Sequence, residues 1–78
     1  MKRSYNADLF GYEANIYYHV DENNNIKHVH LRGNEIDLME LIHRCMEIDP
    51  DLTLRDLLST MEDAAIYAYK HGIDKEEI

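Results

Sequence analysis

Residues 12–20 alternate strictly between two sets of side chains, and this alternation limits the possible folds more than any other feature of the chain. The apolar or aromatic set is Tyr12, Ala14, Ile16, Tyr18 and Val20. The other set is Glu13, Asn15, Tyr17 and His19. A period of two that is rich in β-branched and aromatic residues predicts a β-strand with one buried face.

A turn and a second strand follow this segment. Residues 21–25 are rich in Asn, which tolerates the positive φ angles of a tight hairpin turn, and residues 26–32 form the expected second strand. Centring the turn on residues 23–24 defines the pairing. The expected pairs are Val20 with Lys27, Tyr18 with Val29 and Ile16 with Leu31 on one face, and His19 with His28 and Tyr17 with His30 on the other. A slip of one residue would mix the faces, so the apolar pattern sets the register.

Residues 4–10 leave two interpretations open. Tyr5, Ala7 and Leu9 alternate in the manner of a third strand, and Gly11 would then be a bend or a bulge. The sequence leaves open whether residues 4–10 form this third strand or the sheet has two strands only.

The period changes to that of a helix after Gly33. Asn34 is the expected N-cap, and the apolar residues that follow cover about half of a helical circumference. Pro50 disfavours helical geometry in Asp49, so the pattern predicts a helix over 34–49. Its apolar arc is wider than one small sheet needs, which favours dimerisation or partner binding through this helix.

A second helix is expected over 53–71. Thr53 and Asp56 have the spacing of a capping box, and Gly72 is a typical helix stop. Ile66 and Tyr67 lie outside its apolar stripe. Residues 74–78 are expected to be a frayed tail. The sum is one α+β domain spanning 1–78, in which an antiparallel sheet of two or three strands over 4–32 is covered on one face by two antiparallel helices.

The net charge restricts the partners of this chain. Sixteen Asp and Glu residues stand against eight Lys and Arg residues, which gives -8 over 78 residues. Residues 1–33 hold four acids and four bases, so the whole excess lies in 34–78. An acidic balance steers a protein toward basic partners and argues against direct nucleic-acid binding. In size and charge the chain resembles small proteins of phages and mobile elements.

Cysteine content and hydropathy bear on the compartment. Cys45 is the only cysteine, so no disulfide can form within the chain. No apolar run reaches the roughly 18 residues of a membrane span, and the first residues lack the core of a signal peptide. We expect a cytoplasmic protein, in the host cell if the protein is viral, with no membrane contact.

Three histidines raise the question of a metal site. His19, His28 and His30 would share one face of the hairpin, with Tyr17 and Asp21 nearby, and three imidazoles can bind Zn²⁺. The solvated face of an antiparallel sheet is also expected to be polar, and we prefer this interpretation. The alternative remains a metal-binding or pH-responsive protein.

Other patterns with possible chemistry fail at individual positions. Residues 21–32 begin like an EF-hand loop, but Ile26 and Arg32 stand where that loop needs Gly and Glu. Glu40 and His43 have the spacing of a di-metal motif that needs a second copy, which the chain lacks. Cys45 lies on an apolar arc, where a cysteine is usually a small buried side chain. The sequence therefore predicts no enzyme and no cofactor.

We expect a non-enzymatic module that binds another protein through acidic and aromatic side chains. Its most specific form is an inhibitor whose carboxylates mimic the charge of nucleic acid toward a basic nucleic-acid-handling protein. The candidate contacts are Glu40, Glu47, Asp49, Asp51, Asp56, Glu62, Asp63 and Tyr67. The alternative from a different class is a small homodimer or assembly module that uses the helix faces.

Overall fold

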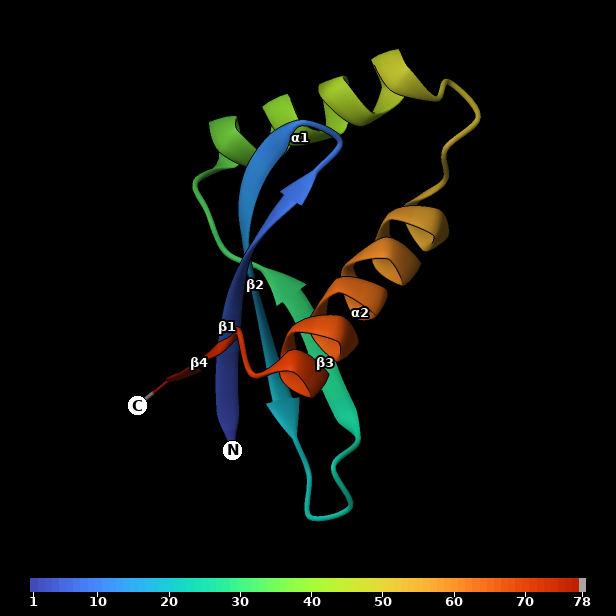
Figure 1. Cartoon of the computed structure of the whole chain (residues 1–78). Coiled ribbons are helices and arrows are strands. Elements are labelled where there is room, and N and C mark those ends of the chain that lie inside the picture. Colours follow the sequence, from blue (N-terminus) through green and yellow to red (C-terminus); the bar gives the residue numbers. More distant parts are fainter. Residues whose placement is uncertain (78) are drawn as a thin grey trace.

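Residues 1–77, which the computed structural model describes apart from the side chains of residues 35 and 36, form a four-stranded antiparallel sheet and two helices (Figure 1). The elements are β1 (Lys2–Leu9), β2 (Tyr12–Val20), β3 (Ile26–Leu31), α1 (Glu35–Ile48), α2 (Leu54–His71) and β4 (Lys75–Glu77). The strand order in the sheet is β3-β2-β1-β4. The predicted α+β fold, with helices packed on an antiparallel sheet, is confirmed.

The first hairpin settles the open question about the N-terminal segment. It is a regular strand, β1, and it pairs with β2 from Lys2 opposite His19 to Leu9 opposite Tyr12. The two-residue loop between them has φ of 55° at Phe10 and 83° at Gly11. Positive φ at both loop residues matches the right-handed twist of the strands, and glycine adopts it without steric cost.

The second hairpin follows the predicted register at one end only. Ile16 lies opposite Leu31 and Tyr17 opposite His30, as predicted. Nearer the turn the prediction is wrong, because His19 lies opposite Lys27 and the register shifts between these pairs. A β-bulge at this point, with φ of 57° at His28, adds one residue to β3.

The turn itself explains this shift. The Asp21 carboxylate accepts hydrogen bonds from the backbone N–H groups of Asn23 and Asn25, each at 2.9 Å. The Asp21 N–H also donates to the carbonyl of Asn25, at 3.1 Å. These bonds stabilise a loop wider than the tight turn that we predicted, so strand pairing resumes with Val20 opposite Ile26.

The C-terminal segment also differs from the prediction. Residues 75–77 of the expected frayed tail form β4, which pairs with β1 from Lys2 opposite Glu77 to Ser4 opposite Lys75. The physical reason is a set of side-chain contacts between positions far apart in the sequence. Asp74 binds Arg3 and Tyr18, and Glu77 accepts a hydrogen bond from the Ser4 hydroxyl. The last strand is therefore attached at both of its ends.

The two helices cover different parts of the sheet. Helix α2 runs across one face, and its buried residues are Leu57, Met61, Ala65 and Ala68. Helix α1 lies across the end of the sheet near the β1–β2 turn, and the helices diverge from the segment that joins them (Figure 1). Leu41 and Cys45 attach α1 to the core, each 1% exposed. The core fills the space between these elements and one face of the sheet.

The helix ends carry the predicted caps. The Asn34 side chain accepts a hydrogen bond from the N–H of Asp37 at 2.9 Å. Thr53 and Asp56 form a complete capping box. At the other end of α2, Gly72 has φ of 66°, and the N–H of Ile73 donates to the carbonyl of Ala68 at 3.1 Å. This left-handed ending turns the chain back toward β1.

Candidate functional site

The predicted contact residues lie on α1, on α2 and on the segment between them, and all eight are exposed. Three of the acids already have local partners. Glu40 lies 3.8 Å from Arg44 on the next turn of α1. The Asp49 carboxylate accepts a hydrogen bond from the N–H of Asp51, and Asp56 belongs to the capping box. These partners give Glu40, Asp49 and Asp56 a role in helix structure.

The other acids are available to a partner. Within residues 1–77, no ion pair or side-chain hydrogen bond engages the carboxylates of Glu47, Asp51, Glu62 and Asp63. A solvated carboxylate without a fixed partner keeps its full charge for long-range attraction of a basic molecule. The acidic surface is therefore defined by these four residues.

Tyr67 is 56% exposed and is held by a contact within α2. Its ring lies 4.2 Å from the ring of His71, one helical turn further on, at an interplanar angle of 39°. The neighbouring Ile66 is 42% exposed. Both side chains lie well down α2 from its start at Leu54, so Tyr67 belongs to a separate part of the helix surface from the feature described next.

An apolar hollow of about 190 Å³ lies where α1 and α2 diverge. Its lining comes from the end of α1, the joining segment and the start of α2: Ile42, Cys45, Met46, Leu52, Thr53, Leu54 and Leu57. Leu54 is 76% exposed and Met46 is 52% exposed. The wide apolar arc of α1 indicated an unpartnered face, but the hollow itself depends on the angle between the helices, which the sequence does not specify.

Cys45 forms part of this region without being accessible from it. The side chain is almost fully buried, and burial raises the pKa of its thiol. A buried neutral thiol is a poor nucleophile and a poor metal ligand. Cys45 therefore acts as a core residue that joins α1 to the sheet.

The three histidines do lie together on the sheet face opposite α2, in part through the bulge. The His19 and His28 rings are 5.3 Å apart in an edge-on arrangement, and His30 Nδ1 lies 2.7 Å from the carbonyl oxygen of His28. Burial, and then the charge of neighbouring His28, lowers the pKa of His19. In the part of the chain that the structure describes, no group of three or more His, Cys, Asp or Glu side chains is arranged to hold a metal ion.

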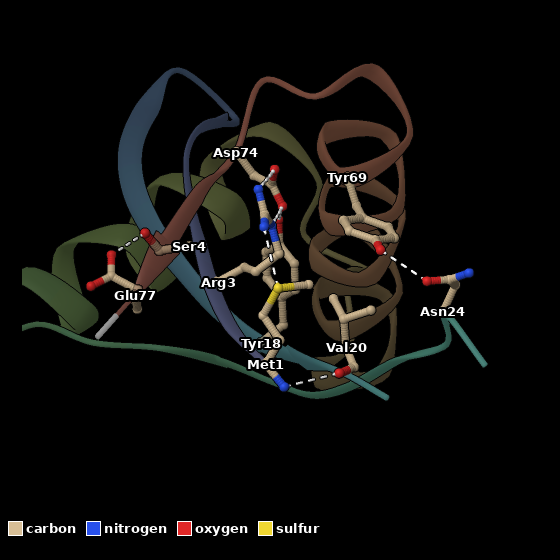
Figure 2. A network of polar contacts seen from close by, with 9 residues as sticks. All are labelled: Met1, Arg3, Ser4, Tyr18, Val20, Asn24, Tyr69, Asp74 and Glu77. Carbon is tan, nitrogen blue, oxygen red and sulfur yellow. Dashed lines mark hydrogen bonds and ion pairs between the residues drawn. The ribbon is translucent and has the colours of Figure 1, made fainter. Parts of the chain in front are cut away.

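Sequence reasoning missed a buried ionic cluster that joins the two ends of the chain. The Arg3 guanidinium binds both carboxylate oxygens of Asp74, at 2.6 and 2.7 Å, and the Tyr18 hydroxyl donates to the same carboxylate (Figure 2). The Asp74 side chain is fully covered, and that of Arg3 is 18% exposed. One signal in the sequence could have indicated this cluster. Odd-numbered residues of β1 such as Ala7 face the core, and the same alternation places Arg3 on that face.

The pKa values in this cluster reflect its paired charges. Burial alone would raise the pKa of Asp74, but the hydrogen bonds from Arg3 and Tyr18 and the charge of Arg3 hold it below its ordinary value. Burial, together with the bond to Asp74, raises the pKa of Tyr18. Asp74 is therefore ionised and Tyr18 is neutral at physiological pH, as a stabilising cluster requires.

The chain matches no protein-family model, no curated protein and no solved structure. Neither α1 nor α2, the helices of residues 1–77, combines the length and the apolar character that a transmembrane helix needs.

Proposed function

We propose that this protein is a non-enzymatic binding module whose helical surface takes a basic, amphipathic helix of another protein. The observation that carries the proposal is the apolar hollow between α1 and α2 and the carboxylates that adjoin it in the chain. Glu47 follows Met46 directly, and Asp51 precedes Leu52. An amphipathic helix with Lys and Arg on its polar face offers apolar side chains and positive charge side by side.

The two kinds of contact contribute in different ways. Met46 and Leu54 supply most of the free energy of binding. Fully burying one exposed side chain of this kind contributes about 1.5 to 3 kcal/mol, of which Met46 can add about half and Leu54 about three quarters because they are 52% and 76% exposed. The carboxylates mainly raise the association rate and make it depend on salt. We expect the basic face of the partner to lie toward Glu47 and Asp51, which neighbour lining residues in the chain.

The hollow favours this partner over the two alternatives. A pure mimic of nucleic-acid charge has no use for exposed Met and Leu side chains. A symmetric homodimer through the same surface would bring two negatively charged helical surfaces together, and like charges oppose association. Inhibition of a basic nucleic-acid-handling protein remains compatible with the proposal, provided that the partner presents such a helix. The single buried cysteine suits action in the cytoplasm, of a host cell if the protein is viral.

The test is a titration of isotope-labelled protein with a synthetic amphipathic helical peptide that carries Leu on one face and Lys on the other. We expect the largest NMR shifts at Ile42, Met46 and Leu54. Met46→Glu should weaken binding by about tenfold or more, because it places a carboxylate where an apolar side chain should be buried. Met46 is half-exposed, so the variant is expected to fold.

A matched pair of charge variants separates local from global electrostatics. Glu47→Gln with Asp51→Asn removes two charges that neighbour lining residues of the hollow in the chain. Asp8→Asn with Glu13→Gln removes two exposed charges from the sheet face that α2 does not cover. The first pair should slow association clearly more than the second. Equal effects of the two pairs, or shifts confined to the sheet, would overturn the proposed site. A stable dimer that buries Met46 and excludes the peptide would support the homodimer instead.

A further inference from the structure

Helix α2 leaves one face of the sheet uncovered (Figure 1), and this face carries both basic side chains such as Lys2 and acidic ones such as Glu13. Lys2, His19 and Lys27 lie side by side in one row across β1, β2 and β3. The bulge adds His28 to the same face, where its ring contacts that of His19. Lys27 is paired with Asp21 at 3.2 Å, so within residues 1–77 the positive charge of this row that has no ion pair is that of Lys2.

Tyr17 lies on this face and contacts Arg32 and His30. The Arg32 guanidinium carbon is 4.5 Å from the centroid of the Tyr17 ring, and the His30 ring stacks on Tyr17 at 5.9 Å and 24°. These contacts hold a guanidinium and an imidazole against one aromatic ring. Preorganised groups lose less conformational freedom when a ligand binds.

Two hollows adjoin Tyr17, and they differ in chemistry. The first has a volume of about 130 Å³, and its lining is mostly basic and aromatic but includes one carboxylate: Lys2, Arg3, Tyr17, Tyr18, His19, His30, Arg32 and Glu77. Arg3 is already paired with Asp74, so within residues 1–77 the cations of this lining without an ion pair are Lys2 and Arg32. A hollow of this size with two such positive charges, of which Arg32 is held against Tyr17, suits a phosphate group.

The second hollow, of about 250 Å³, is largely neutral. Its lining includes Asn6 and Asn15, with Ser4, Tyr5, Ile73 and Lys75. Asn6 Nδ2 donates to Asn15 Oδ1 at 3.1 Å, and this bond does not use the Asn6 side-chain oxygen or the Asn15 side-chain NH₂ group. One acceptor beside one donor is the pattern that matches the hydrogen-bonding edge of a nucleobase.

Tyr17 and Glu77 line both hollows, and Glu77 therefore lies at the junction between them. The Ser4 hydroxyl donates to its carboxylate. A carboxylate there would repel a phosphate placed beside it, but it accepts hydrogen bonds from sugar hydroxyl groups, as acidic residues do in nucleotide-binding folds. Across this face the cations of the first hollow are thus followed by the Glu77 carboxylate and then by the amide groups of the second hollow.

We propose that this open face binds a nucleoside monophosphate, with the phosphate against Lys2 and Arg32, the ribose at Glu77 and the base at Asn6 and Asn15. The site is independent of the helical surface described above. A single nucleotide fits better than a nucleic-acid strand, because a strand would extend its phosphates along a molecule of strongly negative net charge.

Calorimetric titrations with adenosine, guanosine, cytidine and uridine monophosphates test the proposal, with adenosine and inorganic phosphate as partial ligands. We expect at least one monophosphate to bind about tenfold or more tightly than either partial ligand, because phosphate and base are held together. Arg32→Gln should weaken that binding by about tenfold or more, the effect of losing a charge-assisted contact.

Arg55→Gln is the matched control, since it removes one exposed positive charge from α2 and leaves the sheet face intact. It should bind the nucleotide as tightly as the unmodified protein. Glu77→Gln should reduce the preference for a ribonucleotide over its deoxyribose counterpart. Failure of all four monophosphates to bind, equal binding of inorganic phosphate, tighter binding of a single-stranded oligonucleotide, or an unchanged affinity in Arg32→Gln would each overturn the proposal.

Discussion

The cluster of Arg3, Tyr18 and Asp74 makes one side chain responsible for holding the C-terminal strand, and Asp74→Asn tests this directly. The substitution keeps the size of the side chain and removes its charge. Arg3 then keeps a positive charge that is 82% covered by its surroundings, and Tyr18 loses a strong acceptor for its buried hydroxyl. One acceptor oxygen remains, so the two donors compete for it.

The magnitude follows from the burial of the pair. Removing one partner of a buried ion pair costs about 3 to 5 kcal/mol, because the other charge stays buried without compensation. Water can partly hydrate Arg3, whose side chain is 18% exposed, so we expect a loss at the lower end, about 3 kcal/mol. A domain of this length has a stability of roughly 4 to 12 kcal/mol in total. The variant should therefore melt at least about 12 °C below the unmodified protein.

Urea unfolding followed by circular dichroism gives the free energy of unfolding for both proteins. Asp63→Asn is the matched control, because it makes the same chemical change at an exposed position on α2 and should stay within about 0.5 kcal/mol. The difference caused by Asp74→Asn should also depend on pH. The pKa of Asp74 is lower in the folded protein than in the unfolded chain. The stabilisation by its charge is therefore fully present at a pH above the unfolded-state pKa, and it is lost as the pH falls through the folded-state pKa.

The difference in free energy of unfolding between Asp74→Asn and the unmodified protein should accordingly become smaller below about pH 4. Hydrogen exchange supplies a second measurement, since the amides of residues 75–77 should lose protection in Asp74→Asn while those of β2 keep it at low urea. A variant as stable as the control, with residues 75–77 still protected, would refute the claim that this carboxylate attaches β4 to the sheet.

Two further predictions concern local features. Thr53→Ala removes an acceptor 3.2 Å from the N–H of Asp56 and should cost about 1 kcal/mol in urea unfolding, whereas an unchanged midpoint would contradict the role of the capping box. The pKa of His19 is lowered in the folded protein, so the unfolded chain takes up its proton first and stability should fall as pH drops through about 6.5. His19→Gln should make this part of the stability profile flatter, and an identical profile would show that the imidazole contacts are without effect.

Local patterns in the sequence account for much of this fold. The alternation over 12–20 and the helical period after Gly33 predict elements that the structure contains, and the caps at Asn34 and Thr53 lie where residue preference places them. These features depend on neighbours a few positions apart. The bulge at His28 escaped prediction because it follows from side-chain bonds of Asp21 that widen the turn.

Contacts between distant positions explain what the sequence left unspecified. Arg3 and Asp74 are 71 positions apart, and no local pattern indicates that a charged tail should pair with β1. The same holds for the candidate sites. Exposed acids such as Glu47 were predictable from helical periodicity, but the hollow beside Met46 depends on the angle between α1 and α2. The two hollows beside Tyr17 likewise require the positions of all four strands.

The central claim is that apolar burial and negative charge act together at the junction of α1 and α2. Its most direct test is the dissociation constant of a fluorescent basic amphipathic peptide, measured at low and high salt for the unmodified protein and for Met46→Glu. The account predicts that salt weakens binding to the unmodified protein, and that Met46→Glu binds about tenfold or more weakly at both salt concentrations. Binding to Met46→Glu as tight as to the unmodified protein, or an affinity independent of salt, would contradict it.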